Sequence, residues 1–222
     1  KAKSLIKLNR HQELLADYNN LPHQHPLVTD PGMQLLVSRS LMGLEQYEKA
    51  ASVSRSALQR LNTQNAGQPN ENTELQFALV ENLILIQLQS PPTTQTASSS
   101  NNLLMLCDKA GQISTHNNSP IWSECALAHA SAGQFDKALT YTQWAELWFA
   151  EFGTSKQTIE NRLIKALIQV ELGEVEDGIL SVNQAISQME KANPQGSNLE
   201  PETTIDPKDS FSFDYTRQEA CI

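Results

Sequence analysis

The stretch that decides the fold is residues 121–149, IWSECALAHASAGQFDKALTYTQWAELWF. On both sides of Gly133, its apolar residues recur every three or four positions, which is the period of an α-helix. Glycine permits the tight reversal that ends one helix before the next begins. The stretch therefore predicts two helices joined by a short turn at Gly133.

Two other stretches repeat this pattern. They are residues 33–61, MQLLVSRSLMGLEQYEKAASVSRSALQRL, and residues 159–189, IENRLIKALIQVELGEVEDGILSVNQAISQM. Each places a large side chain two residues after the turn, where it would be buried between the two helices. Small residues follow and let the paired backbones approach closely. The aligned turns are LEQYEKA at 44–50, AGQFDKA at 132–138 and LGEVEDG at 172–178, followed by Ala57, Ala145 and Ala185.

This combination of an early Trp, a turn glycine, an aromatic two residues later and small residues in the second helix resembles the tetratricopeptide repeat (TPR) family. The repeat at 119–152 carries most of the pattern. In the repeat at 31–64, Glu45 stands where the turn glycine belongs, and in the repeat at 159–192, Arg162 stands in the Trp position. The residues that define the repeats are Tyr47, Ala50, Trp122, Ala126, Gly133, Phe135, Ala138 and Gly173.

A fourth, divergent hairpin is expected over residues 72–112. Residues 75–89, LQFALVENLILIQLQ, are long enough to favour a helix, although periodicity alone leaves a strand open for LILIQL. Asn72 and Thr73 offer its N-cap. Residues 90–102 have almost no core-forming side chains and predict a flexible loop, after which a short helix is expected over 103–110.

The two ends of the chain read differently. Residues 5–18 predict one helix, the second helix of an earlier hairpin, and the pairs Asp30-Pro31 and Ser119-Pro120 are typical helix starts. Residues 193–222 predict a polar, acidic and mostly unstructured tail, whose Phe211, Phe213 and Tyr215 could dock back to cap the last helix. The repeat domain is therefore expected to span residues 1–192.

These elements predict an all-α fold, a solenoid of about four stacked helical hairpins. A single hairpin cannot bury its apolar face alone, so neighbours stack and form a curved surface lined by first helices. Extended peptides and amphipathic helices suit such a surface. The resemblance implies a peptide-binding stripe of Leu35, Arg39 and Met42, then Ser123, Leu127 and Ala130, then Leu163, Leu167 and Val170.

Two readings of this stripe stay open. Its leucines suit an apolar peptide or helix, but apolar residues at helical spacing are more often core. Family members that grip a terminal carboxylate use Lys, Arg and Asn here, and this chain offers only Arg39. A carboxylate clamp is therefore not expected.

Composition and charge disfavour several classes of partner and location for this protein. The 222 residues carry 16 Lys and Arg against 25 Asp and Glu, a net charge of −9, which disfavours nucleic acid as the partner. No apolar run reaches the roughly 18 residues that span a bilayer, so we expect a soluble protein. Three cysteines without a CxxC pair exclude a disulfide-stapled scaffold, and their odd number slightly favours a reducing, cytoplasmic compartment. Because the chain begins at Lys1, an upstream segment is expected.

Candidate chemistry is sparse. His23 and His25 form the only close histidine pair, but no cysteine or carboxylate accompanies them at a ligand spacing, so we expect a loop and no metal or cofactor. Cys125 and His129, four residues apart, could form a nucleophile pair, but Cys125 stands where the repeat needs a small packing residue. The aromatic cluster Trp144, Trp148, Phe149 and Phe152 packs against the next repeat or anchors a partner.

The sequence thus predicts a non-catalytic adaptor or scaffold that binds another protein through a peptide or helix. One alternative is a regulatory helical-repeat segment of a larger enzyme or membrane-anchored protein, whose other part precedes residue 1. A third reading, that the chain is itself an enzyme, lacks any recognisable motif.

Overall fold

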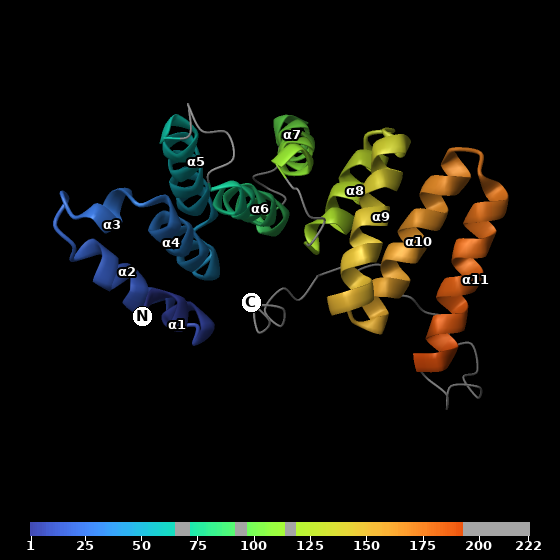
Figure 1. The fold of residues 1–222 in the computed structure, drawn as a ribbon, viewed down its shortest axis with the longest axis horizontal. Helices are drawn as coiled ribbons and strands as arrows, with labels where there is room; N and C mark the ends of the chain where they lie inside the picture. The colour runs from blue at the N-terminus through green and yellow to red at the C-terminus, as the bar shows by residue number, and fades with distance from the viewer. Residues whose placement is uncertain (65–71, 92–96, 114–118, 193–222) are drawn as a thin grey trace.

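The computed structural model describes residues 1–64, 72–91, 97–113 and 119–192. Throughout these ranges all regular secondary structure is helical, which confirms the all-α prediction (Figure 1). The helices are α1 (Ala2–Lys7), α2 (His11–Asn19), α3 (Pro26–Thr29), α4 (Pro31–Gly43), α5 (Tyr47–Gln64), α6 (Thr73–Gln89), α7 (Ala97–Ile113), α8 (Ile121–Ser131), α9 (Phe135–Phe152), α10 (Ser155–Glu171) and α11 (Val175–Ala192).

The three recognised repeats are the antiparallel hairpins α4–α5, α8–α9 and α10–α11. They stack in chain order, with α6 and α7 between the first hairpin and the other two, so that the molecule forms a curved row of helices (Figure 1). This is the TPR-like solenoid that the repeats predict. The repeats at 119–152 and 159–192 are 40 residues apart because both helices between their turns are long: α9 has 18 residues and α10 has 17. α10 begins at Ser155, four residues before the expected start.

The three hairpin turns share one hydrogen-bond pattern. The amides of Gln46, Gln134 and Glu174 donate to the carbonyls of Leu41, His129 and Gln169, at 2.8, 2.9 and 2.8 Å. This six-to-one bond is typical of a helix that ends on a left-handed residue. Gly133 and Gly173 supply that conformation with φ of +70° and +83°, and Glu45 adopts it in the first repeat with φ of +59°.

Gly43 does not replace the missing turn glycine of the first repeat. It lies inside the last turn of α4, where a Cβ would come within 2.5 Å of the His11 ring on α2. Its role is therefore close packing between α2 and α4, and the strained turn falls on Glu45 alone.

The divergent hairpin is partly as predicted. α6 spans Thr73–Gln89 and confirms the helix over 75–89, although Asn72 makes no side-chain capping bond and has a φ of +65°. The prediction of a loop up to residue 102 is wrong, because α7 already begins at Ala97 and runs to Ile113. A helix that packs against α6 and α8 along part of its length can propagate into a neighbouring stretch of polar sequence.

The N-terminal prediction also needs correction. The single helix expected over 5–18 is two helices, α1 and α2, because Asn9 adopts a left-handed conformation with φ of +53° between them. Asparagine tolerates this conformation better than other non-glycine residues. The expected start at Asp30-Pro31 is confirmed, since Asp30 is the N-cap of α4 and accepts the Met33 amide at 2.6 Å. At Ser119-Pro120 the helix begins one residue later than expected, with Pro120 as the N-cap of α8, and Ser119 accepts the Ile121 amide at 3.3 Å.

The core is one apolar cluster that follows the interfaces between successive helices from Leu5 to Ile168. Trp122, Ile84 and Leu79 are fully buried within it. The predicted tail, residues 193–222, with Phe211, Phe213 and Tyr215, lies outside the described residues. None of the described helices is long and apolar enough to cross a membrane.

Candidate binding surface

The predicted stripe on the first helices divides into buried and exposed positions. Leu35 and Ser123 are buried, at 7% and 1% exposure, and belong to the core rather than to a binding surface. Arg39, Met42 and Ala130 are half-buried. The four exposed positions are Leu127 at 37%, Leu163 at 39%, Leu167 at 69% and Val170 at 48%.

The α8–α9 hairpin is covered by the helix that follows it. The following helix, α10, contacts both α8 and α9 and so covers the cleft between them. There the buried Asn161 of α10 donates from Nδ2 to the carbonyl oxygen of Thr142 at 3.0 Å. Thr142 and Ala126, on facing helices of the hairpin, are fully buried beneath it.

The first hairpin is covered in the same way. α6 lies against α4–α5, and its fully buried Asn82 donates to Ser38 Oγ at 2.9 Å and to Ser54 Oγ at 3.0 Å. Ser54 and Ser38 are themselves joined at 2.8 Å. The α4–α5 and α8–α9 hairpins thus share one arrangement: each is covered by the helix that follows it, and a buried asparagine of that helix donates hydrogen bonds to the hairpin.

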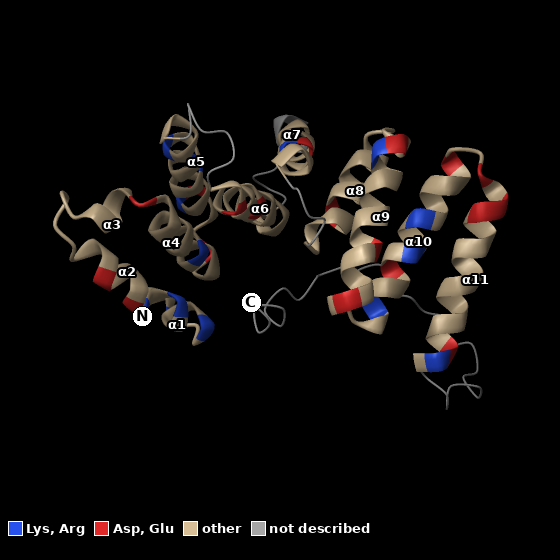
Figure 2. Cartoon of the chain, viewed as in Figure 1, with Lys and Arg blue, Asp and Glu red and all other residues tan. Residues whose placement is uncertain are grey.

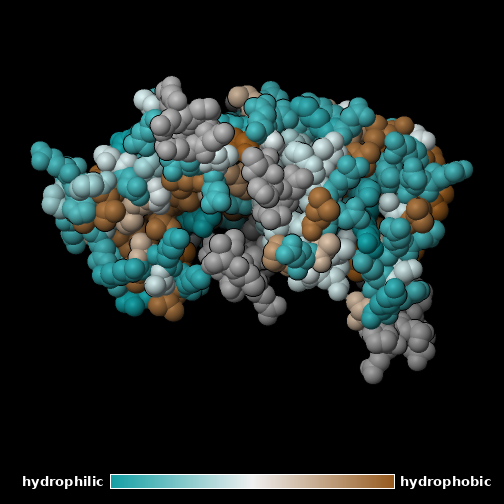
Figure 3. Space-filling view, viewed as in Figure 1, coloured by the Kyte–Doolittle hydropathy of each residue, from teal (hydrophilic) through white to brown (hydrophobic). Residues whose placement is uncertain are grey.

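No described helix covers the third hairpin. Between α10 and α11 lies an open, mostly apolar cleft of about 440 Å³. In the space-filling view, brown apolar surface is visible at this end of the molecule (Figure 3). We call this the terminal cleft; its lining is Leu163, Ala166, Leu167, Val170, Gly178, Ile179, Val182 and Asn183.

Charged side chains join neighbouring helices beside the stripe. Arg39 Nη2 lies 4.0 Å from Glu81 Oε2 on α6, and Glu81 also accepts a 2.6 Å bond from Ser119. Between α9 and α10, Glu146 pairs with Lys165 at 2.8 Å and with Arg162 at 3.7 Å, and blue and red segments meet there in Figure 2. Arg162, in the position of Trp122, therefore bonds back to the preceding hairpin.

Glu124 is the one carboxyl on α8 with a displaced titration. Burial, and to a smaller extent the nearby charge of Glu160 on α10, raise the pKa of Glu124 to about 7. Close to neutral pH this part of the inner face therefore carries a partly protonated carboxyl.

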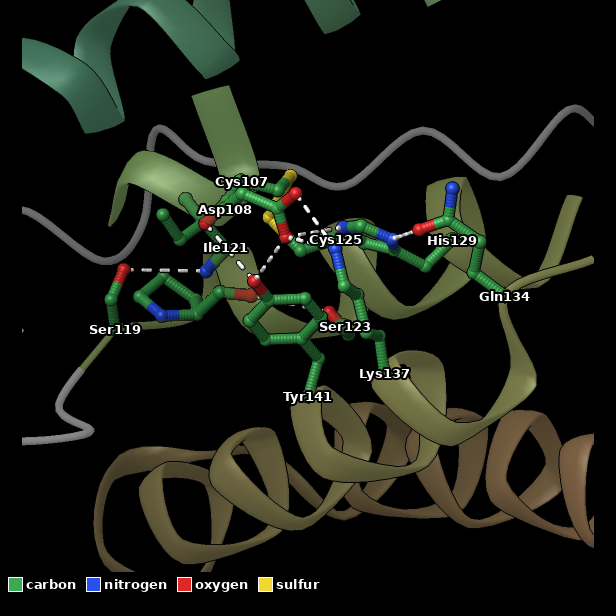
Figure 4. Close-up of a disulfide and its surroundings, with 11 residues drawn as sticks. Cys107, Asp108, Ser119, Ile121, Ser123, Cys125, His129, Gln134, Lys137 and Tyr141 are labelled. Atoms are coloured by element: carbon green, nitrogen blue, oxygen red, sulfur yellow. Dashed lines mark hydrogen bonds and ion pairs between the residues drawn. A yellow bond between two sulfur atoms is a disulfide. The ribbon is translucent and has the colours of Figure 1, made fainter. Parts of the chain in front are cut away.

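The link between α7 and the α8–α9 hairpin is covalent. A disulfide joins Cys107 of α7 to Cys125 of α8, and both residues are fully buried (Figure 4). Cys125 is buried, as the packing interpretation expects, but its pairing with Cys107 was not anticipated from the sequence. Spacing could not reveal the pair, because α7 meets α8 only through the three-dimensional stacking. In this oxidised form Cys125 is not available as a nucleophile.

Around the disulfide, Asp108 collects three side chains from α8 and α9 (Figure 4). It pairs with Lys137 at 2.8 Å, lies 3.6 Å from His129 Nε2, and accepts a 3.4 Å bond from Tyr141. Burial and the Asp108 charge raise the pKa of Tyr141 far above its usual range, so its hydroxyl stays protonated. His129 Nδ1 is 2.9 Å from Gln134. The cluster fixes the junction between the two halves of the solenoid.

The aromatic cluster at the end of α9 divides between core and surface. Trp144 contacts Trp122 of its own repeat edge-on at 5.0 Å between ring centroids, and Phe149 is buried. Trp148 contacts both Phe149 and Phe152, and Phe152 is 49% exposed. Packing thus accounts for Trp144 and Phe149, while Phe152 is left at the surface.

One histidine of the pair, His25, has a local structural role. His25 caps α3 by accepting the Leu27 amide at 3.2 Å through Nδ1. Among the described residues no group of three or more His, Cys, Asp or Glu side chains could hold a metal ion.

Sequence reasoning missed half of the terminal cleft, the part that α11 supplies. Gly178, Ile179 and Val182 recur at helical spacing, which is the signal of a buried face, but they line an open cleft because none of the described helices covers them. Asn82 and Asn161 were also missed, since a polar residue inside an apolar helix carries no sign of the partner it will meet.

Comparisons with solved structures support the fold. A structure described as "MamA MSR-1 C2" matches with a TM-score of 0.58 and 14% identity, over 86% of this chain and 94% of that one. "MamA AMB-1 P212121" matches with 0.58 and 13%, over 86% and 96%. A Podosopora anserina kinesin light chain structure with nearly identical TPR-like repeats matches with 0.52 and 14%, over 87% and 89%. No family model and no curated protein matches the sequence.

Proposed function

We propose that this chain is a non-catalytic adaptor or scaffold module that binds another protein through a peptide or amphipathic helix. The observation that carries the proposal is the exposure of large apolar side chains at matched positions of two contacting first helices. Leu127 of α8 and Leu167 of α10 stand at the same place in successive repeats, and both face solvent. Clustered exposed apolar side chains of this kind typically mark interaction sites.

The electrostatics favour the same class of partner. Arg39, the one cation of the predicted stripe, already lies beside Glu81, and the inner face of α8 carries Glu124. A site for a terminal carboxylate or for a phosphate backbone needs unpaired cations at these positions. A ligand that buries apolar side chains against Leu127, Leu163 and Leu167 fits the observed surface better.

The same surface would serve the alternative, in which the module regulates a larger enzyme or membrane-anchored protein. In that case the docked segment comes from the other part of the same protein. The adaptor proposal is preferred because it needs only features that the described residues contain.

The experiment is capture from an extract of the source cell, read by mass spectrometry, with the wild type and the double variant Leu127→Glu/Leu167→Glu. We expect specific proteins to be retained by the wild type and lost by the double variant, because two charges interrupt the apolar surface. Far-UV circular dichroism should stay unchanged, since both leucines are exposed.

Leu147→Glu is the matched control, because Leu147 is 63% exposed but lies on α9 outside the stripe. It should capture the same proteins as the wild type. If the double variant retains every specific partner, or if it unfolds, the proposed surface is not the binding site.

A further inference from the structure

The terminal cleft is the counterpart of two clefts that the chain fills with its own helices. Asn82 on α6 enters the α4–α5 cleft and Asn161 on α10 enters the α8–α9 cleft. The equivalent third cleft has the same hairpin geometry and an apolar lining, but none of the described residues enters it. In the two preceding hairpins, the surface at the equivalent position is covered by a following helix.

Exposed apolar side chains are concentrated at this end of the molecule. Of fourteen large apolar side chains that are exposed among the described residues, eight lie between residues 163 and 189. Four of them, Leu163, Leu167, Val170 and Ile179, line the terminal cleft, and clustered exposed apolar side chains typically mark an interaction site. The eight are Leu163, Leu167, Val170, Val175, Ile179, Leu180, Ile186 and Met189.

The chain continues for 30 residues beyond the end of α11 at Ala192, which lies at the same end of the solenoid. From Ala192 back to Ile179 the helix rises by about 20 Å, at about 1.5 Å per residue. The chain from Ala192 to Phe211 can extend to about 60 Å at about 3.3 Å per residue. The segment around Phe211 therefore reaches the cleft with length to spare.

This segment is also the most apolar part of those 30 residues. Phe211, Phe213 and Tyr215 stand within five positions, FSFDY, whereas the rest of the stretch offers only isolated large apolar residues. Aromatic side chains bury the largest apolar areas of any residues. A tethered segment acts at an effective concentration on the order of millimolar, which favours it over a free ligand or a second copy of the chain.

We propose that the aromatic segment 211–215 docks into the terminal cleft of its own chain. It covers Leu163, Leu167 and Ile179 as α10 covers the cleft before it. Because Leu163 and Leu167 also belong to the proposed partner surface, the docked segment competes with a partner at α10 and leaves Leu127 on α8 free. The inference does not depend on the proposed function, since docking needs no partner.

The test is hydrogen–deuterium exchange of the purified full chain, read by mass spectrometry of peptides. The triple variant Phe211→Ser/Phe213→Ser/Tyr215→Ser should exchange at least about fivefold faster in α10 and α11 than the wild type, while α4 and α5 stay unchanged. Leu199→Ser/Ile205→Ser, which alters apolar residues of the tail outside the segment, is the control and should match the wild type. Unchanged exchange in α10 and α11 of the triple variant overturns the proposal.

A second readout identifies the occupant of the cleft. Cys107 and Cys125 are joined in the disulfide, so a nitroxide label can be attached to Cys221 alone. In the labelled chain, methyl signals of Leu163, Leu167 and Ile179 should broaden, and the triple variant should abolish the broadening. To separate a second copy, isotope-labelled chains without nitroxide are mixed with nitroxide-labelled chains that carry no isotope. Broadening of the same intensity in that mixture shows docking by a second copy and overturns the proposal, as does no broadening in the labelled chain.

Discussion

The covered α8–α9 cleft and the open terminal cleft are two versions of one structure. Ser123 and Leu163 occupy the same place in successive repeats, yet Ser123 is 1% exposed and Leu163 is 39% exposed. At the matched place on the second helices, Thr142 is fully buried whereas Val182 lines the open cleft. The difference between them is the following helix, α10, which is present over one cleft and has no described counterpart over the other.

This comparison shows that burial in a solenoid is a property of the interface between neighbours. The small residues Ala126 and Thr142 are fully buried in the covered hairpin, and the Thr142 carbonyl oxygen accepts the hydrogen bond from Asn161 of α10. The larger Leu163 and Val182 leave the terminal cleft apolar. A protein can use such an end as a binding surface because no internal packing depends on it.

The largest expected effect comes from placing a charge at the two matched positions. Ser123→Glu should lower the free energy of unfolding by about 3 kcal/mol or more, because the carboxylate would be buried without a partner. Leu163→Glu should change it by less than about 1 kcal/mol, because no described helix packs over Leu163 and a docked 211–215 segment is released instead, which leaves the carboxylate in solvent. Urea unfolding of both variants measures the difference. Equal losses would mean that the two clefts are equally covered.

The disulfide is a second difference between the α8–α9 hairpin and the α10–α11 hairpin. Among the described residues, only the α8–α9 hairpin is held by a disulfide, which joins Cys125 to Cys107 of α7 across a sequence separation of 18. Cys107→Ala/Cys125→Ala should therefore lower the free energy of unfolding by about 3 kcal/mol. Dithiothreitol should lower the thermal midpoint of the wild type and of a Cys221→Ser control, but not that of the double variant. A wild type indifferent to reductant would show that the bond contributes nothing.

A smaller effect is expected from Glu124, which α10 helps to bury. Its pKa is raised to about 7, so between pH 4.5 and 7 the folded chain keeps a proton that the unfolded chain loses. This group therefore makes the protein less stable as pH rises through that range. Glu124→Gln should be more stable than the wild type by about 1–2 kcal/mol at pH 8, and equally stable below pH 4.5.

Unfolding curves at pH 4.5 and pH 8 decide the matter. A Glu124→Gln variant that gains nothing at pH 8 would contradict the burial of this carboxyl.

The smallest effect is expected at the turns. Glu45 adopts the left-handed conformation that Gly133 supplies in the covered hairpin. Glu45→Gly should raise the free energy of unfolding by about 0.5–1 kcal/mol, and Gly133→Ala should lower it by about 1 kcal/mol, because only glycine adopts this conformation without strain. Thermal denaturation of both variants gives the signs, and the same sign for both would show that the turns are not equivalent.

The sequence predicted the fold where a local pattern decides it. The aligned turns around Glu45, Gly133 and Gly173 identify three hairpins, because the residue types needed at a tight reversal are few. The early start of α7 at Ala97 was missed, because its first turns contain no apolar residue larger than alanine, and periodicity finds a helix only through its buried face.

The candidate site was less accessible to sequence reasoning. Leu35 and Leu167 carry the same signal, an apolar residue on a first helix, yet one is buried at 7% and the other is 69% exposed. Which of them meets solvent depends on the neighbouring helix. The pairing of Cys107 with Cys125 depends on stacking between helices in the same way.

The most direct test of the proposed function is the affinity of the purified chain for a captured partner, measured by calorimetry. We expect Leu127→Glu/Leu167→Glu to bind about 100-fold more weakly than the wild type, since each leucine lost from a contact costs on the order of 1–2 kcal/mol. Leu147→Glu should bind as the wild type does. Equal affinities of the wild type and the double variant, with both chains fully helical, would contradict the account.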